Sequence, residues 1–194
     1  LLGGPLGGYF ADSNAGWSNT ISNFNATNDW TRVFLISDRI ISTLYGNLST
    51  VKQVSENTNN PVPYAIAQII KVAAMSRVTD AYGPIPYSEM GKGEFQVAYD
   101  DLKTLYHNMF DDLTRSINVL SAFVQENEGK EVPVAEYDII YNGDFSKWIK
   151  YANSLKLRMA VRIASNTEDT EYAKQMMAEA INAVSYTHLR AHET

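Results

Sequence analysis

Residues 100–124 read DDLKTLYHNMFDDLTRSINVLSAFV, and this stretch decides the fold class. Apolar side chains recur in it every three or four residues over about five turns. They are Leu102, Leu105, Tyr106, Met109, Phe110, Leu113, Ile117 and Leu120. Burying such a stripe contributes on the order of 10 to 20 kcal/mol before the entropy of ordering the chain is subtracted. The stretch therefore predicts a long amphipathic helix with one face against a core.

Other segments of the chain show the same helical period. Further helices are expected over residues 30–46, 62–81, 145–163 and 168–183. Asp29 is a suitable N-cap for the first of them, which we expect to end near Gly46-Asn47. No segment alternates convincingly as a strand would, and residues 1–29 read as a loop-rich segment. The sequence therefore predicts an all-α fold of antiparallel helical hairpins over residues 30–183.

Composition excludes several classes of protein. With 45% hydrophobic residues, 20% charged residues and a net charge of -6, the chain has the balance of a globular domain. A nucleic-acid-binding protein needs a basic surface, and this chain is acidic without a lysine and arginine cluster. It contains no cysteine, which excludes disulfides and thiolate metal sites, and no apolar run of about 18 residues that could span a membrane.

Two pairs of adjacent aspartates could suggest glycoside hydrolysis, in which two carboxyl groups flank the scissile bond. Neighbouring residues on a helix do not face each other, however. Asp100-Asp101 suits the start of a helix, and Asp111-Asp112 suits a solvated helix face. His107 lies on the polar side of the stripe with no evident serine or aspartate partner, so we expect neither a catalytic residue nor a cofactor.

Two turn motifs have sufficient structural explanations. In residues 82–88, Gly83 permits an unusual φ and two prolines stiffen the exit, which predicts a corner between helices. In Asn142-Gly143-Asp144 the glycine makes a turn and the aspartate caps the next helix. Trp30 and Trp148 belong to apolar stripes and are expected in the core, and Glu126 to Glu136 is expected to be a charged loop.

Three blocks of sequence, taken together, carry a resemblance to a known family. They are YGPIPYSE at residues 82–89, YDDL at 99–102 followed by Tyr106 and Asp112-Leu113, and NGD at 142–144 leading through Lys147-Trp148 to ANSLKLR at 152–158. In this order and spacing they resemble the SusD/RagB family of outer-membrane nutrient-binding lipoproteins. The resemblance covers most of residues 30–165. It implies a tetratricopeptide-like array of helix pairs, although no 34-residue repeat can be recovered from this sequence alone.

The resemblance also implies a function and partners. A member of this family would be a non-enzymatic, lipid-anchored subunit at the cell surface of the outer membrane. It would bind a glycan or another nutrient and deliver it to a TonB-dependent, SusC-like transporter. Two alternatives remain open: a helical-repeat scaffold that binds only proteins, and a glycoside hydrolase.

The amino-terminal segment holds the candidate ligand-binding residues Tyr9, Asn14 and Trp17. The apolar C–H face of a sugar stacks on an aromatic ring, while asparagine bonds the sugar hydroxyls, and no helical stripe requires these rings in a core. The alternative, that Tyr9 and Trp17 simply cover the helices, stays open.

Both ends of the chain are expected to be truncated. It begins at Leu1 with no signal peptide and no acylated cysteine, so the lipid anchor would lie outside it. Residues 184–194 resemble one reading frame of a transposase sequencing adapter, which predicts a non-native tail. His188 and His192 in that tail are spaced i, i+4, as metal ligands can be, but zinc needs further ligands and we expect no metal site.

Overall fold

The computed structural model describes residues 40–127 and 135–190, with side chains described through residue 183. Its elements are α3 (Ile40–Asn57), α4 (Val62–Tyr82), α5 (Leu102–Glu126), the short 3-10 helix η3 (Ala135–Tyr137), α6 (Phe145–Ile163) and α7 (Thr170–Arg190). Within the described ranges the only strand-like pairing is an isolated antiparallel bridge between Ile85 and Asp100. The all-α prediction is confirmed.

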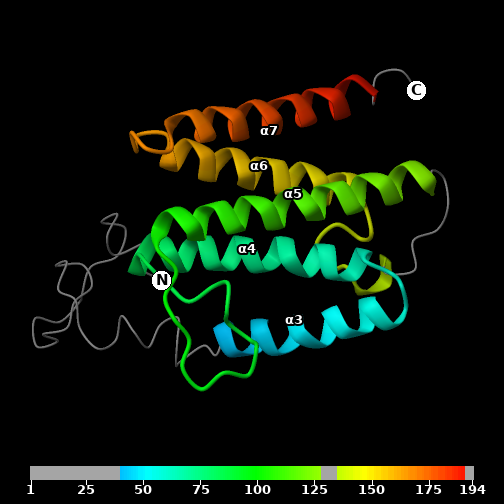
Figure 1. Cartoon of the computed structure of the whole chain (residues 1–194). Coiled ribbons are helices and arrows are strands. Elements are labelled where there is room, and N and C mark those ends of the chain that lie inside the picture. Colours follow the sequence, from blue (N-terminus) through cyan, green and yellow to red (C-terminus); the bar gives the residue numbers. More distant parts are fainter. Residues whose placement is uncertain (1–39, 128–134, 191–194) are drawn as a thin grey trace, which may run out of the picture. The chain divides into compact units, whose positions relative to one another are not determined.

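The chain divides into two compact units, residues 1–44 and residues 45–194. Residues 40–44, the described part of the first unit, form the first turn of α3. In the second unit, α4, α5, α6 and α7 lie side by side in chain order, each antiparallel to the one before (Figure 1). These helix pairs form the tetratricopeptide-like arrangement that the resemblance implied.

The core of the second unit forms where α5 packs against α4 on one side and α6 on the other. The predicted stripe of α5 supplies much of it. Its buried members are Leu105, Tyr106, Met109, Phe110, Leu113 and Leu120. Leu102 is 46% exposed, because it is the first residue of the helix and lies beyond the packed region. Trp148 of α6 is 2% exposed, as predicted, whereas Trp30 lies outside the described residues.

The predicted end of the first helix is wrong. Instead of stopping near Gly46-Asn47, α3 continues to Asn57. A β-carbon on Gly46 would meet nothing within 4 Å, so this glycine sits in an ordinary helical position and does not break the helix. The helix ends before Asn59, which adopts a positive φ of 49°. The expected N-cap, Asp29, lies outside the described residues.

The starts of α5 and α6 and the end of α4 follow from local chemistry. Asp101 accepts a hydrogen bond from the Thr104 backbone N–H (3.0 Å), and Asp144 accepts one from the Lys147 backbone N–H (3.2 Å). Both are N-caps, as the sequence predicted for aspartates at these positions. Gly83 ends α4 with φ 78° and ψ -135°, a conformation open essentially only to glycine. None of the described helices is long and apolar enough to cross a membrane.

One basic residue of α6 is buried. Lys156 follows Leu155 in the sequence, and its side chain is only 3% exposed. Its ammonium group lies 2.6 Å from the Glu179 carboxylate of α7 and 3.1 Å from the Thr114 hydroxyl of α5. Burial is possible because both neighbouring helices supply oxygen atoms to the charge.

Candidate functional site

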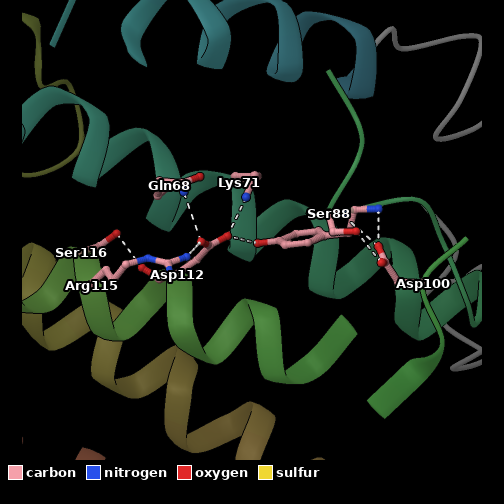
Figure 2. Close-up of polar contacts among 8 residues, drawn as sticks. Gln68, Lys71, Ser88, Asp100, Asp112, Arg115 and Ser116 are labelled. Carbon is pink, nitrogen blue, oxygen red and sulfur yellow. Dashed lines mark hydrogen bonds and ion pairs between the residues drawn. The ribbon is translucent and has the colours of Figure 1, made fainter. Parts of the chain in front are cut away.

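A buried carboxylate, Asp112 of α5, connects three parts of the chain (Figure 2). Its carboxylate oxygens lie 2.6 Å from the Lys71 ammonium group and 2.7 Å from the Tyr87 hydroxyl, which donates to it. The Gln68 side-chain amide donates from 3.2 Å, and the Arg115 guanidinium lies 2.5 Å away. Lys71 and Gln68 come from α4, and Tyr87 comes from the loop that follows α4. We call these five residues the Asp112 cluster.

The cations and hydrogen-bond donors of the Asp112 cluster keep the Asp112 carboxylate ionised. Burial alone would raise the pKa of Asp112, but the Lys71 charge and the hydrogen bonds from Lys71, Tyr87 and Arg115 outweigh it and hold the pKa below its ordinary value. Burial lowers the pKa of Lys71, and the Asp112 carboxylate opposes that effect. The cluster therefore holds an ionised carboxylate between two cations, which suits a structural anchor and does not suit a general acid.

The sequence analysis placed both Asp111 and Asp112 on a solvated face, and for Asp112 this is wrong. Asp111 is exposed, but Asp112 is 5% exposed. Consecutive residues on a helix point about 100° apart, so Asp111 can face solvent while Asp112 faces the core. The sequence of α4 held a signal for a buried carboxylate. Lys71 lies among the buried residues Ile69 and Val72, and a buried lysine requires a partner of opposite charge.

A second aspartate fixes the loop that leads from α4 to α5. One oxygen of Asp100 accepts hydrogen bonds from the Tyr87 and Ser88 backbone N–H groups, both at 2.8 Å. The other accepts from the Ser88 hydroxyl at 2.6 Å, and Figure 2 shows this clamp beside the Asp112 cluster. The prediction that residues 82–88 form a structural corner is confirmed. The clamp also fixes where the Tyr87 ring lies.

A cavity of about 280 Å³ opens beside the Asp112 cluster, within the second unit. It lies between α3, α4 and the loop residues 87–92. Its wall includes three tyrosines and three lysines, which are Tyr45, Tyr64, Tyr87, Lys52, Lys71 and Lys92. The Lys71 ammonium group stands 4.1 Å from the centre of the Tyr87 ring, so one face of that ring is already occupied.

The tyrosines of this cavity are neutral hydrogen-bonding groups at ordinary pH. Burial raises the pKa of Tyr45, Tyr64 and Tyr87, and the Asp112 charge raises each further. Tyr87 uses its hydroxyl on Asp112. Tyr45 is only 7% exposed, and its hydroxyl is buried without a hydrogen-bond partner among the described residues. The cavity can therefore offer cations and ring faces to a ligand, while the hydroxyls of Tyr45 and Tyr87 are enclosed or already bonded.

A further polar cluster lies near the start of α5. His107 has an aspartate partner that the sequence did not reveal, because its Nε2 atom is 3.1 Å from Asp169, which is 62 positions away in sequence. The His107 ring stacks on Tyr172 of α7 with ring centres 3.9 Å apart. Nearby, Asp80 accepts from the Tyr106 hydroxyl at 2.9 Å and pairs with Arg162. These contacts join α4, α5, α6 and α7.

The remaining sequence-based site predictions fall largely outside the described residues. Tyr9, Asn14 and Trp17 lie there, and so does His192, while the side chain of His188 is likewise not described. Among the residues that the structure does describe, no group of three or more histidine, aspartate or glutamate side chains is placed to hold a metal ion.

Comparison with known proteins shows which family the chain matches. Residues 1–187 match the SusD-like model described as "Susd and RagB outer membrane lipoprotein". A crystal structure of a SusD homolog from Bacteroides uniformis is 67% identical, with a TM-score of 0.82 over 94% of this chain and 36% of its own. A SusD-like protein from Bacteroides thetaiotaomicron is 35% identical, with a TM-score of 0.74 over 87% of this chain and 34% of its own.

A third similar structure is that of a chitin-binding protein. It is a SusD homolog from Flavobacterium johnsoniae, 29% identical, with a TM-score of 0.67 over 75% of this chain and 29% of its own. The chain thus spans about a third of the length of these relatives. The search of functionally curated proteins gave no match.

Proposed function

The chain belongs to the SusD/RagB family of outer-membrane lipoproteins, and from this premise we propose that it is part of a cell-surface subunit that binds a glycan. The full-length protein would deliver this glycan to a TonB-dependent, SusC-like transporter and would be held to the membrane by a lipid anchor. The observation that carries the proposal is the match to the Bacteroides uniformis SusD homolog over nearly the whole chain. The chitin-binding relative supports a glycan as the ligand class.

Two of the aspartates that could have suggested glycoside hydrolysis have structural contacts. Asp100 accepts three hydrogen bonds, and Asp112 is paired with two cations, so neither is placed to donate a proton to a leaving group. The mechanism that we propose for a binding subunit is stacking of sugar rings on aromatic side chains, with hydrogen bonds to sugar hydroxyls.

We place the principal glycan contacts in the amino-terminal segment, at Tyr9, Asn14 and Trp17. The test uses the full-length protein and the best glycan from an array, titrated by calorimetry. Trp17→Ala and Tyr9→Ala should each lower affinity at least tenfold, and Asn14→Ala should lower it several-fold. Tyr137→Ala serves as the matched control, since Tyr137 is a 75% exposed tyrosine on η3, and it should leave affinity unchanged. If the Trp17, Tyr9 and Asn14 variants bind the glycan as tightly as Tyr137→Ala and the wild type, these three residues are not part of the site.

A scaffold that binds only proteins is the second candidate, and one observation favours it. Ile70, Ile140, Tyr141 and Trp148 border an apolar cavity of about 250 Å³, and the neighbouring Ile139 is 95% exposed. Such apolar surface is typical of protein contacts. If the full-length protein copurifies with a transporter but binds no glycan on an array, the scaffold interpretation replaces ours.

A further inference from the structure

We propose that the cavity between α3, α4 and residues 87–92 binds an acidic unit of a glycan, a sugar ring that bears a carboxylate or a sulfate ester. The inference rests on the proposed function, because it narrows the ligand class. It concerns a different part of the chain from Tyr9, Asn14 and Trp17, so the two can fail separately.

The charge of the cavity wall favours an anion. Among the described residues that line it, Lys52, Lys71 and Lys92 are cationic and none is a carboxylate. Behind the wall, Lys71 is already paired with Asp112, and the Asp100 carboxylate is bonded to Tyr87 and Ser88. The attraction for an anion therefore comes from Lys52 and Lys92, whose ammonium groups stand at the rim of the cavity.

The two outer lysines are available to a ligand. Lys92 pairs with Glu89 at 2.7 Å and Lys52 with Glu56 at 3.9 Å, but all four side chains are more than half exposed. Exposed ion pairs of this kind contribute little to stability. Either ammonium group can therefore turn toward an anion in the cavity at small cost.

The size and the rings of the cavity favour a sugar over a bare ion. A volume of about 280 Å³ lies just below the usual range for small-molecule pockets, which begins at about 300 Å³, and suits one sugar ring rather than an oligosaccharide. Tyr64 is partly exposed at the wall and offers a ring face for stacking. The Asp100 clamp and the Asp112 cluster hold Tyr87 and Ser88 in place, so this side of the cavity is preorganised.

Tyr45 contributes its ring and not its hydroxyl to the cavity. The residue lines the cavity and is more than nine-tenths buried, and its hydroxyl is enclosed without a partner among the described residues. A ligand in the cavity would therefore meet the Tyr45 ring, as it would meet the ring of Tyr64.

Calorimetry on the full-length protein tests the ligand class. The probes are methyl β-D-glucuronide, methyl β-D-glucoside 6-sulfate, the neutral methyl β-D-glucoside and inorganic sulfate. At least one acidic sugar should bind tenfold or more tightly than the neutral glucoside, and raising the salt concentration should weaken that binding several-fold. Equal binding of acidic and neutral sugars would overturn the inference. Inorganic sulfate binding as tightly as the acidic sugars would overturn its sugar component.

Paired variants test the location. Lys52→Gln with Lys92→Gln should lower affinity for the acidic sugar at least tenfold. Lys103→Gln with Lys147→Gln is the matched control, because these lysines are similarly exposed and each pairs with an aspartate elsewhere. The control should leave affinity unchanged. If both double variants bind alike, the acidic sugar is not held in this cavity.

Tyr45→Phe removes the enclosed hydroxyl while keeping the ring. It should leave binding of the acidic sugar unchanged and the melting temperature unchanged or higher, because the hydroxyl is closed to the cavity and no described partner is lost. Weakened binding would contradict this description of the cavity wall. A protein that binds neutral glycans on an array but no acidic sugar would end this inference alone, whereas a protein that binds no glycan would end the proposed function as well.

Discussion

At the residue scale, Asp112 is buried and depends on partners from several parts of the chain. Its carboxylate joins α4, α5 and the loop after α4 through partners from all three. Breaking a buried ion pair by removing one member is costly, because the other charge is left buried without compensation. The side chain of Lys71 is only 9% exposed, so it cannot regain full hydration when Asp112 is neutralised.

We expect Asp112→Asn to lower the free energy of unfolding by about 3 to 5 kcal/mol, the range for breaking a buried pair. Asp111→Asn is the matched control, since it changes the same chemical group one position earlier on the exposed face, and should change stability by less than about 0.5 kcal/mol. Urea denaturation followed by circular dichroism measures both. Similar losses for the two variants would show that the Asp112 cluster is not a stabilising anchor.

The lowered pKa of Asp112 predicts a pH dependence of stability. Because the folded-state pKa lies below the unfolded value of about 3.9, the unfolded chain binds more protons in this window. The contribution to stability is therefore complete at neutral pH and is lost as the pH falls from about 5 through the folded pKa. Melting temperatures measured between pH 7 and pH 3 should fall more steeply for the wild type than for Asp112→Asn. Parallel curves would contradict this assignment.

At the level of elements, helices whose ends are set by local chemistry were predicted closely. Asp101 and Asp144 cap helices through contacts only three residues away, and such contacts can be read from sequence. The end of α3 could not be read, because Gly46 resembles a stop but lies in the helix interior. Propensity at one glycine was overridden by the helical pattern that continues through Leu48 and Val51.

Two glycine substitutions, one in a turn and one inside a helix, should have opposite effects on stability. Gly143 has φ 79°, and a β-carbon there would lie 2.7 Å from that of Ala135, so Gly143→Ala should destabilise the protein by roughly 1 to 3 kcal/mol. Gly46 is helical with open space around it, so Gly46→Ala should stabilise by about 0.5 to 1 kcal/mol. Thermal denaturation of the two variants distinguishes them. A stabilising Gly143→Ala would mean that the turn before α6 differs from the one described.

At the scale of the whole molecule, the all-α class and the family could be predicted, whereas the cavity could not. The fold follows from periodicity along the chain. The Asp112 cluster depends on residues 25 and 44 positions apart, and the cavity joins α3, α4 and a loop. Contacts at such separations leave only indirect signals in a single sequence, such as a lysine within the apolar pattern of α4.

The interpretation of residues 184–194 as a translated sequencing adapter remains a prediction. The backbone of α7 continues to Arg190, which does not distinguish a native segment from a translated adapter. Resequencing the source DNA across these codons should show reads that depart from the present sequence at Val184. Codons for all eleven residues followed by a stop would contradict the adapter interpretation and would make a zinc-binding test of His188 and His192 worthwhile.

The most direct test of the central claim is a glycan array probed with the full-length protein. We predict that it binds one or a few related glycans, that soluble forms of the same glycans compete for the protein, and that Trp17→Ala weakens the signal. Absence of binding to every glycan, with the protein folded and a transporter copurifying, would contradict a glycan-binding subunit and support a protein-binding scaffold.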